Sequence, residues 1–233
     1  MSFKAVSAGA LTESVDELNS LPPAPLGPKY EREIKREFLE KMVASLYANY
    51  DKYNLQTAFW GYWHAIAAPV HIAAVHYGAV IEALQKTFVE ANASLVKKEI
   101  VDAEKWQLCF EKISICISDV DAPSEEKEIL LNKAKNLNFS PQNILLKKFL
   151  EALNIQIDDV ETAALKSRNR AAHGGKIGRE KFGDVIRKNK VLMVLINRIF
   201  LAISGGSDSY YDYYTLGRPT SRLESPIPND KVI

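Results

Sequence analysis

Three residues suited to acid–base and phosphate chemistry, Arg168, Asn169 and His173, lie within six consecutive positions of this chain. Histidine can transfer protons near neutral pH, while arginine and asparagine can hydrogen-bond a phosphate. Cleavage of RNA without a metal needs a base, an acid and hydrogen-bond donors for the negatively charged phosphate of the transition state. The three residue types therefore indicate half of an RNA-cleaving site.

A helix is expected to carry these residues, because Asp158 and Glu161 have the spacing of a capping box ahead of an apolar periodic run. At about 100° per residue, Arg168 falls inside the apolar stripe of this helix. A guanidinium cannot be buried alone, so Arg168 must face a partner group, a cleft or a subunit interface. The stripe consists of Ile157, Val160, Ala164 and Ala171, with Leu165 and Ala172 beside it.

His173 would end this helix if Gly174 adopts the left-handed conformation of a C-terminal cap. Asn169 lies one turn earlier on the same face. The negative end of the helix favours the imidazolium, whereas nearby Arg168 disfavours it, and such opposing influences can leave a histidine titrating near neutrality. The motif holds one histidine, and a two-fold dimer that pairs this helix with its mate would supply a second. It would also explain an arginine on a buried face.

The pattern Arg168-Asn169-x-x-x-His173 resembles the signature of the HEPN superfamily, and Leu165 and Gly174-Gly175 resemble its ApeA-like form. The resemblance covers roughly residues 69–203. It implies an all-α domain, and many such domains are metal-independent ribonucleases of toxin–antitoxin, abortive-infection, CRISPR and other antiviral systems.

By this resemblance, His173 would be the acid and base, Arg168 would stabilise the scissile phosphate, and Asn169 would orient the phosphate or the histidine. Glu82 has two interpretations, as a pair for any neighbouring basic group or as a supporting partner of Arg168, and we favour the second. Gly175 stands where family members silenced by a nucleotidyltransferase often carry tyrosine, so that mode of regulation loses support.

The motif lies in a locally basic segment. Residues 163–190 contain nine Lys/Arg and two Asp/Glu, an excess of seven positive charges (9 − 2) in a chain of net charge +1. Such a footprint suits a phosphate backbone, although a solvated basic helix end would look the same. The expected RNA contacts are Arg170, Lys176, Arg179 and Lys181.

Hydrophobic periodicity predicts an all-α fold, a HEPN-like bundle of six or seven helices without strand pairs. We expect residues 1–28 to be a tail and Pro-rich linker, 29–204 the helical domain, and 205–233 a C-terminal tail containing tyrosines and prolines. The expected helices are 30–50, 69–92, 95–118, two that start after Pro123 and Ser140, 157–173 and 179–204.

Composition is typical of a globular chain, with 233 residues, 47% hydrophobic and 25% charged. The absence of a signal sequence or a membrane-length apolar run predicts a cytoplasmic protein. We expect no metal and no cofactor.

Several side chains that could do chemistry are assigned to structure instead. These side chains are Cys109 and Cys116 as reduced core thiols, His64, His71 and His76 as core or interface histidines, and Trp60, Tyr62 and Trp63 as packing aromatics.

Three functional hypotheses follow. The first is a homodimeric, metal-independent endoribonuclease in phage defence or a toxin-like system, acting on single-stranded RNA and possessing an antitoxin or a larger defence protein as partner. The second is a catalytically inactive HEPN-like module that binds RNA or a nucleotide, or assembles with a larger protein. The third is an unrelated helical domain, which a monomer with Arg168 in an ion pair inside its own core would favour.

Overall fold

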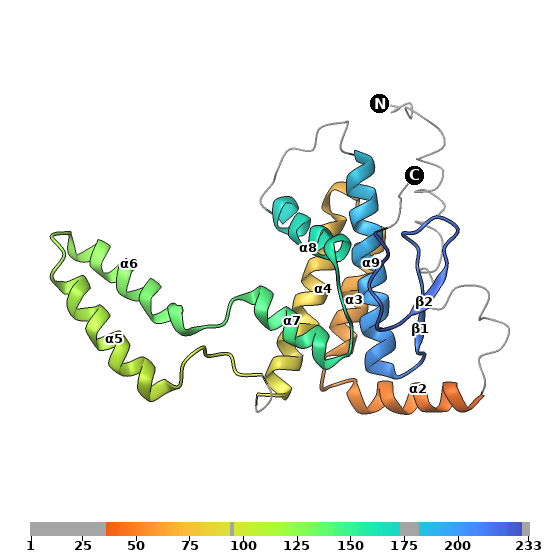
Figure 1. The fold of residues 1–233 in the computed structure, drawn as a ribbon, viewed down its shortest axis with the longest axis horizontal. Helices are drawn as coiled ribbons and strands as arrows, with labels where there is room; N and C mark the ends of the chain where they lie inside the picture. The colour runs from red at the N-terminus through yellow and green to blue at the C-terminus, as the bar shows by residue number, and fades with distance from the viewer. Residues whose placement is uncertain (1–35, 94–95, 173–181, 230–233) are drawn as a thin grey trace. The chain divides into compact units, whose positions relative to one another are not determined.

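The computed structural model describes residues 36–93, 96–172 and 182–229. These residues form eight α-helices, a short 3₁₀ helix and a two-stranded hairpin, so the expected helical class is confirmed and the expected absence of strand pairs is wrong (Figure 1). The described residues divide into two compact units, one within residues 1–88 and 150–233 and the other within Val89–Phe149.

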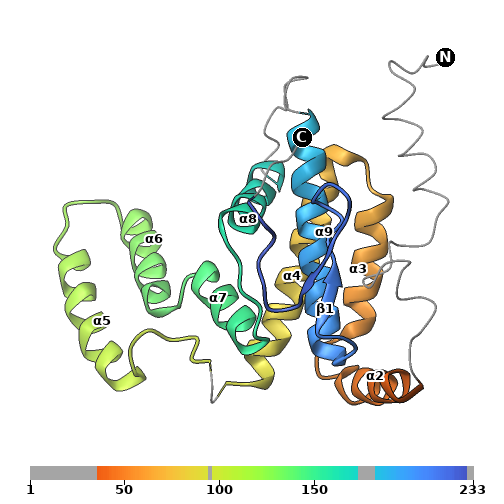
Figure 2. The same cartoon turned by 45° about the vertical axis from the view of Figure 1, so that its right-hand side comes forward.

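The first unit is built around α9 (Phe182–Ser204). Its other helices are α2 (Arg36–Asn49), α3 (Leu55–Ala67), most of α4 (Val70–Ala91) and α8 (Asp159–Ala172). Figures 1 and 2 both show α3, α4 and α9 running side by side, with α2 across one end of α9. Every side chain from Val191 to Leu201 is buried, as expected for a helix enclosed on all sides.

Polar contacts fix the neighbours of α9. The Tyr62 hydroxyl of α3 donates to Asn197 Oδ1 at 2.7 Å, and burial raises the pKa of this tyrosine. At its two ends, Asn189 Nδ2 donates to the Val70 carbonyl at 2.8 Å, and the Ser45 hydroxyl donates to the Ile203 carbonyl at 3.0 Å. Each of these asparagines also keeps one buried polar atom without a hydrogen-bond partner among the described residues, Asn189 Oδ1 and Asn197 Nδ2.

The C-terminal segment returns to this unit. Strands β1 (Ser209–Tyr211) and β2 (Thr220–Arg222) pair antiparallel with Tyr210 opposite Ser221. Tyr210 and Ile227 are almost completely buried. The segment expected to be a tail therefore contributes to the core, and its three-residue strands are too short to show alternation in the sequence.

The second unit contains α5 (Ala103–Ser118), α6 (Ser124–Lys135), the 3₁₀ turn η1 (Asn136–Asn138) and most of α7 (Gln142–Ala152). Asn138 closes the open end of the α5–α6 pair. Its amide oxygen accepts from the Val101 N–H at 2.8 Å, and its Nδ2 donates to the Val101 carbonyl at 2.9 Å. A bridge between Glu99 and Phe139 lies beside this contact.

Several predicted boundaries need correction. The helix expected from residue 95 begins at Ala103, because the backbone around Glu99 is extended in the bridge. Ser124 is the first residue of α6 and makes no side-chain cap. Helix α3 was not expected at all. Within the described part of the chain, every helix is too short or too polar to span a bilayer.

Candidate functional site

Helix α8 begins as expected and carries Arg168 on its third turn. Its first turn is closed by the Asp158 N–H, which donates to Glu161 Oε2 at 3.1 Å, the back-bond of a capping box. From there Ala164 and Leu165 are buried against the core. Arg168 follows on the same side of the helix, and its side chain is only 11% exposed.

The Arg168 guanidinium is bound by groups of α4 in the same chain. Its Nη2 lies 2.8 Å from Glu82 Oε1, and its Nη1 donates to the Gly78 carbonyl at 3.4 Å. The Glu82 side chain is 49% exposed, so the ion pair lies at the edge of the core with its carboxylate reaching solvent. Its net stabilisation is therefore modest, but its geometry fixes the direction of a long side chain.

Gly78 makes room for this arginine. A Cβ at position 78 would lie 2.9 Å from Arg168 Cδ and 3.4 Å from its Cβ. Separations below about 3 Å are repulsive, so the aliphatic stem of Arg168 packs against bare α4 backbone. A glycine on one helix and an arginine on the other thus allow α4 and α8 to lie close together.

Both interpretations of Glu82 from the sequence expected it to pair with a basic residue. The structure shows that this residue is Arg168, as the favoured interpretation expected. The contact also corrects an argument from the sequence, because a buried arginine does not require a second subunit here. The chain supplies its own counter-ion on α4. The arrangement can hold a guanidinium in a fixed direction, with its charge largely offset by a neighbouring carboxylate.

The other six predicted site residues have side chains that lie outside the described part of the structure. Asn169 and Arg170 belong to the backbone of α8, but their side chains are not described. His173, Lys176, Arg179 and Lys181 lie outside the described residues, between the last residue of α8 and the first of α9. Of the predicted site, the structure brings together Arg168 and Glu82.

Arg198 is a buried arginine that sequence reasoning missed. Both it and Glu161 are fully buried, and Arg198 Nη1 lies 2.9 Å from Glu161 Oε1. Arg198 also donates to the carbonyls of Gln156 and Leu223. Glu161 Oε1 further accepts from the Ile227 N–H at 2.8 Å.

This pair joins α8, α9 and the C-terminal segment. Burial lowers the pKa of Arg198, against the opposing influence of Tyr210, whose ring centroid lies 5.0 Å from the guanidinium, and of Glu161. The groups that bind the Arg198 guanidinium all belong to the fold itself. Arg198 therefore has a structural role and is not a site for phosphate. In the sequence, the burial of Arg198 was indicated by its position inside the apolar run "VLMVLINRIFLAIS".

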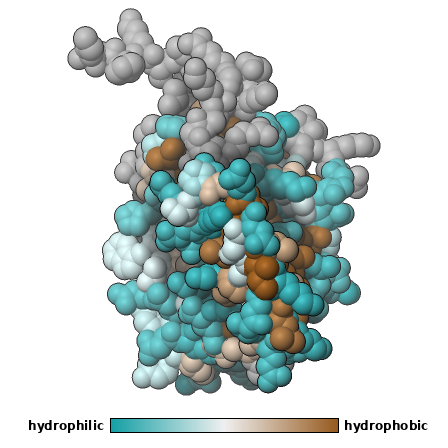
Figure 3. Space-filling view, turned by 90° about the vertical axis from the view of Figure 1, so that its left-hand side faces the viewer, coloured by the Kyte–Doolittle hydropathy of each residue, from teal (hydrophilic) through white to brown (hydrophobic). Residues whose placement is uncertain are grey.

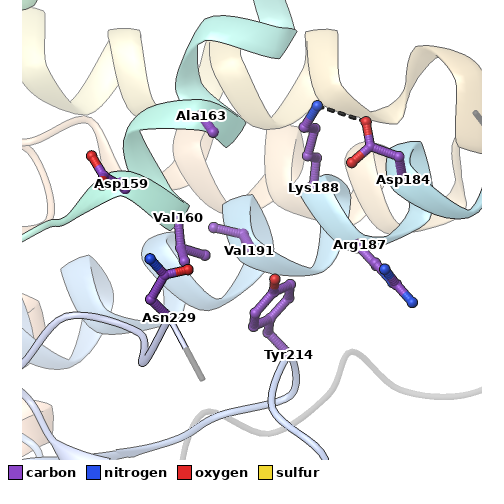
Figure 4. Close-up of a pocket in the computed structure, with 9 residues that line it drawn as sticks. All are labelled: Asp159, Val160, Ala163, Asp184, Arg187, Lys188, Val191, Tyr214 and Asn229. Atoms are coloured by element: carbon purple, nitrogen blue, oxygen red, sulfur yellow. Dashed lines mark hydrogen bonds and ion pairs between the residues drawn. The ribbon is translucent and has the colours of Figure 1, made fainter. Parts of the chain in front are cut away.

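A cavity of about 330 Å³ opens on another face of α8 (Figure 4). The Tyr214 ring points toward Val191, and burial raises the pKa of this tyrosine while Arg187 lowers it. Lys188 is paired with Asp184 at 2.7 Å. The lining residues are Asp159, Val160, Ala163, Asp184, Arg187, Lys188, Val191, Tyr214 and Asn229. The two acidic and two basic side chains of this lining balance in charge, and Arg168 is not one of the lining residues.

Among the other residues assigned to structure, Tyr62 is placed as expected and several others are not. Cys109 and Cys116 are unpaired but exposed, so they are not core thiols. Tyr62 packs in the core, whereas Trp60 and Trp63 of the same helix are exposed. His64 and His71 are exposed, so of the two expectations for them only a place in an interface stays a prediction, and His76 is half-buried. Among the described residues, no three metal-ligating side chains lie close enough together to hold an ion.

Comparison of the chain with protein-family models, with curated proteins and with solved structures gives no match.

Proposed function

We propose that this chain is a metal-independent endoribonuclease of the HEPN type, which cleaves single-stranded RNA in phage defence or a toxin-like system. The observation that carries the proposal is the R-N-x-x-x-H pattern, whose arginine lies on α8 five positions before His173. The ion pair with Glu82 supports it by holding that arginine in one direction. A guanidinium held in one direction suits the recognition of a phosphate.

In the proposed reaction, His173 takes the proton from the ribose 2′-hydroxyl, and that oxygen attacks the adjacent phosphorus. The P–O bond to the next nucleotide breaks, and its oxygen receives a proton, leaving a 2′,3′-cyclic phosphate and a free 5′-hydroxyl. Arg168 would donate hydrogen bonds to the phosphate as its negative charge becomes crowded. Asn169 would orient the phosphate or the histidine.

Glu82 acts in this proposal as a positioning residue for Arg168. One carboxylate oxygen holds Nη2, and the guanidinium has five N–H donors in all, so donors remain for a phosphate. Arg170, Lys176, Arg179 and Lys181 would bind the RNA backbone on either side of the scissile bond.

A homodimer remains part of the proposal for one reason, the single histidine of the motif. An isologous contact between two copies would place two His173 rings across a shared groove, one as base and one as acid. The burial of Arg168 no longer supports this dimer, because Glu82 of the same chain satisfies the guanidinium.

A second function is favoured by the same ion pair. The charge of Arg168 is already balanced and its side chain mostly covered, which suits a catalytically inactive RNA- or nucleotide-binding module, or a helix end with only a structural role. A binding module would retain RNA at low salt without cleaving it, and Arg168→Ala would weaken that binding. If Arg168 has only a structural role, the natural chain and its Arg168→Ala variant should bind RNA with the same affinity.

The direct test is incubation of the full chain with end-labelled single-stranded RNA in EDTA. We expect cleavage to products with cyclic phosphate ends, and loss of cleavage in His173→Ala and Arg168→Ala. Arg222→Ala is the matched control, because that side chain is 82% exposed on β2 and outside the motif. Cleavage that survives in His173→Ala would reject the assignment.

A further inference from the structure

The α5–α6 pair of the second unit leaves apolar side chains uncovered. Helix α5 has no buried residue, and α6 buries only Ala134. Figure 3 shows a run of apolar side chains at the surface between hydrophilic ones. The exposed large apolar residues of the two helices are Leu108, Ile115, Ile129 and Leu130. Exposed apolar patches of this kind mark interaction surfaces.

Helix α6 has one covered face and one free face. The covered face follows Lys127, Leu131 and Ala134, which are half-buried or buried at spacings of four and three. On the other side, four exposed residues form the α6 face: Glu126, Ile129, Leu130 and Lys133. At about 100° per residue they lie within roughly one third of the helix circumference. Ile129 and Leu130 are 49% and 41% exposed at its centre.

The charges of the α6 face are arranged symmetrically about its apolar centre. Glu126 lies three residues before Ile129, and Lys133 lies three residues after Leu130. Within the described part of the chain, neither charged side chain has an ion-pair partner. If a second α6 runs antiparallel about the midpoint between Ile129 and Leu130, each Glu126 meets the Lys133 of the other copy. The sequence of this face is therefore complementary to itself.

We propose that the α6 face is a homodimer contact, in which α6 of one chain packs antiparallel on α6 of a second copy about a two-fold axis. Two helical hairpins joined in this way form a four-helix arrangement. Ile129 and Leu130 make the apolar centre, and two Glu126–Lys133 pairs fix the register. An isologous contact requires one surface that complements itself, and the pattern on α6 meets that requirement. A different partner protein would not need the symmetric placement of these charges.

The distribution of acidic and basic residues along α6 supports the antiparallel arrangement. Acidic residues Glu125 and Glu126 occupy the first turn of α6, and basic residues Lys133 and Lys135 occupy its last turn. Each sign stabilises its own helix end. An antiparallel neighbour brings the acidic half of one helix beside the basic half of the other, whereas a parallel neighbour would place like charges together.

Charge reversal on α6 tests this contact separately from the dimer proposed around His173, because Glu126 and Lys133 lie outside the motif. A loss of association in Glu126→Lys with RNA cleavage unchanged would assign the association to α6. Sedimentation equilibrium of the full chain should show dimers at about 100 µM, a range that suits a small transient interface. Glu126→Lys and Lys133→Glu, each alone, should weaken association about tenfold, because two attractive pairs become repulsive. The variant that carries both changes should associate like the natural chain, and so should an equimolar mixture of the two single variants.

Glu128→Lys and Lys135→Glu are the matched controls. They are exposed, lie seven residues apart like Glu126 and Lys133, and sit on the opposite side of the helix. Leu130→Asp should weaken association through α6 by at least about a hundredfold, since it places a carboxylate in the apolar centre. The exposed position of Leu130 allows the monomer to fold, which circular dichroism checks.

Three results would overturn the contact. They are a natural chain that stays monomeric at this concentration, a Glu126→Lys variant that behaves like Glu128→Lys, and dimers that survive Leu130→Asp but are lost in Leu108→Asp of α5. The last result would mean that the chain associates through α5.

Discussion

The Nη2 atom of Arg168 lies 2.8 Å from Oε1 of Glu82, and this ion pair joins α8 to α4 inside one chain. The arginine comes from the pattern that suggests RNA cleavage, whereas the glutamate stands in an apolar run far from it in sequence. The contact fixes the direction of the guanidinium and offsets its charge. Those two effects would oppose each other in the proposed binding of RNA, and substitution can separate them.

Replacing Glu82 by glutamine removes the negative charge beside Arg168 and retains the size of the side chain. We expect kcat for RNA cleavage to fall about tenfold, because the guanidinium loses its fixed direction. The KM for RNA should not rise, since a negative charge close to the phosphate has been removed. Steady-state kinetics at fixed ionic strength measures both constants.

Asp184→Asn is the control for this substitution. It makes the same charge change in an ion pair with Lys188 on α9, outside the motif. A raised KM with unchanged kcat in Glu82→Gln would contradict a positioning role, because it would mean that Glu82 acts in RNA binding itself.

A Gly78→Ala substitution tests the close packing of α4 on the arginine stem. Alanine favours the helix by about 1 kcal/mol over glycine, but the new Cβ would lie 2.9 Å from Arg168 Cδ. Because overpacking costs about 1–3 kcal/mol, the free energy of unfolding should decrease. In the Arg168→Ala background the crowding disappears, and Gly78→Ala should raise the free energy of unfolding. Urea titration of the four proteins measures this coupling, and equal effects in both backgrounds would exclude the contact.

The two arginines of the core show how far the sequence predicts this structure. Periodicity and capping correctly placed α8 and the apolar face that includes Arg168, since these are local properties. The identity of its partner depended on how α4 packs, and Glu82 was identified through family resemblance. Arg198 interrupts an apolar run, but nothing local links it to Glu161, which already fits a capping box. Its burial requires the carbonyls of Leu223 and Glu224 in the C-terminal segment.

Two other features, helix α3 and the exposure of the α5 cysteines, were not predicted because the local pattern of apolar residues is misleading there. Helix α3 buries Leu55, Ala58, Tyr62 and Ala65 at helical spacing, yet Gly61 and the exposed Trp60 and Trp63 obscure that pattern. In the second unit, α5 carries apolar residues around its circumference. Sequence reasoning therefore assigned its cysteines to a core, whereas a helix paired mainly with α6 leaves them exposed.

Removing one partner of the Arg198–Glu161 pair should be strongly destabilising. Arg198→Met leaves the Glu161 carboxylate buried without its counter-ion and should lower the free energy of unfolding by about 3–5 kcal/mol. The exposed Arg222 is the matched control, and Arg222→Met should change stability by less than about 0.5 kcal/mol. Chemical denaturation monitored by circular dichroism measures both. A loss below about 1 kcal/mol in Arg198→Met would contradict a buried and fully paired cation.

Tyr210 should make stability depend on pH in the alkaline range. Burial raises the pKa of this tyrosine from 10.0 to about 12, although the neighbouring Arg198 lowers it. The folded state therefore holds the phenol proton where the unfolded state has lost it, and the free energy of unfolding falls as pH rises from 10 to 12. The loss should approach about 2 kcal/mol at the upper end.

Tyr210→Phe should reduce this slope, whereas Tyr47→Phe should leave it unchanged, because Tyr47 is 87% exposed on α2. Denaturant unfolding at a series of alkaline pH values gives the slopes. Identical slopes in Tyr210→Phe and the natural chain would show that Tyr210 is not responsible.

The proposed ribonuclease activity is tested most directly by a single-turnover time course with 5′-labelled single-stranded RNA in EDTA. The natural chain, His173→Ala and the control His64→Ala, whose side chain is exposed on α3, would be compared at equal concentration. We predict that the natural chain and His64→Ala cleave at the same rate and that His173→Ala leaves the RNA intact. Equal cleavage by all three, or by none of them, would contradict an active site built on Arg168 and His173.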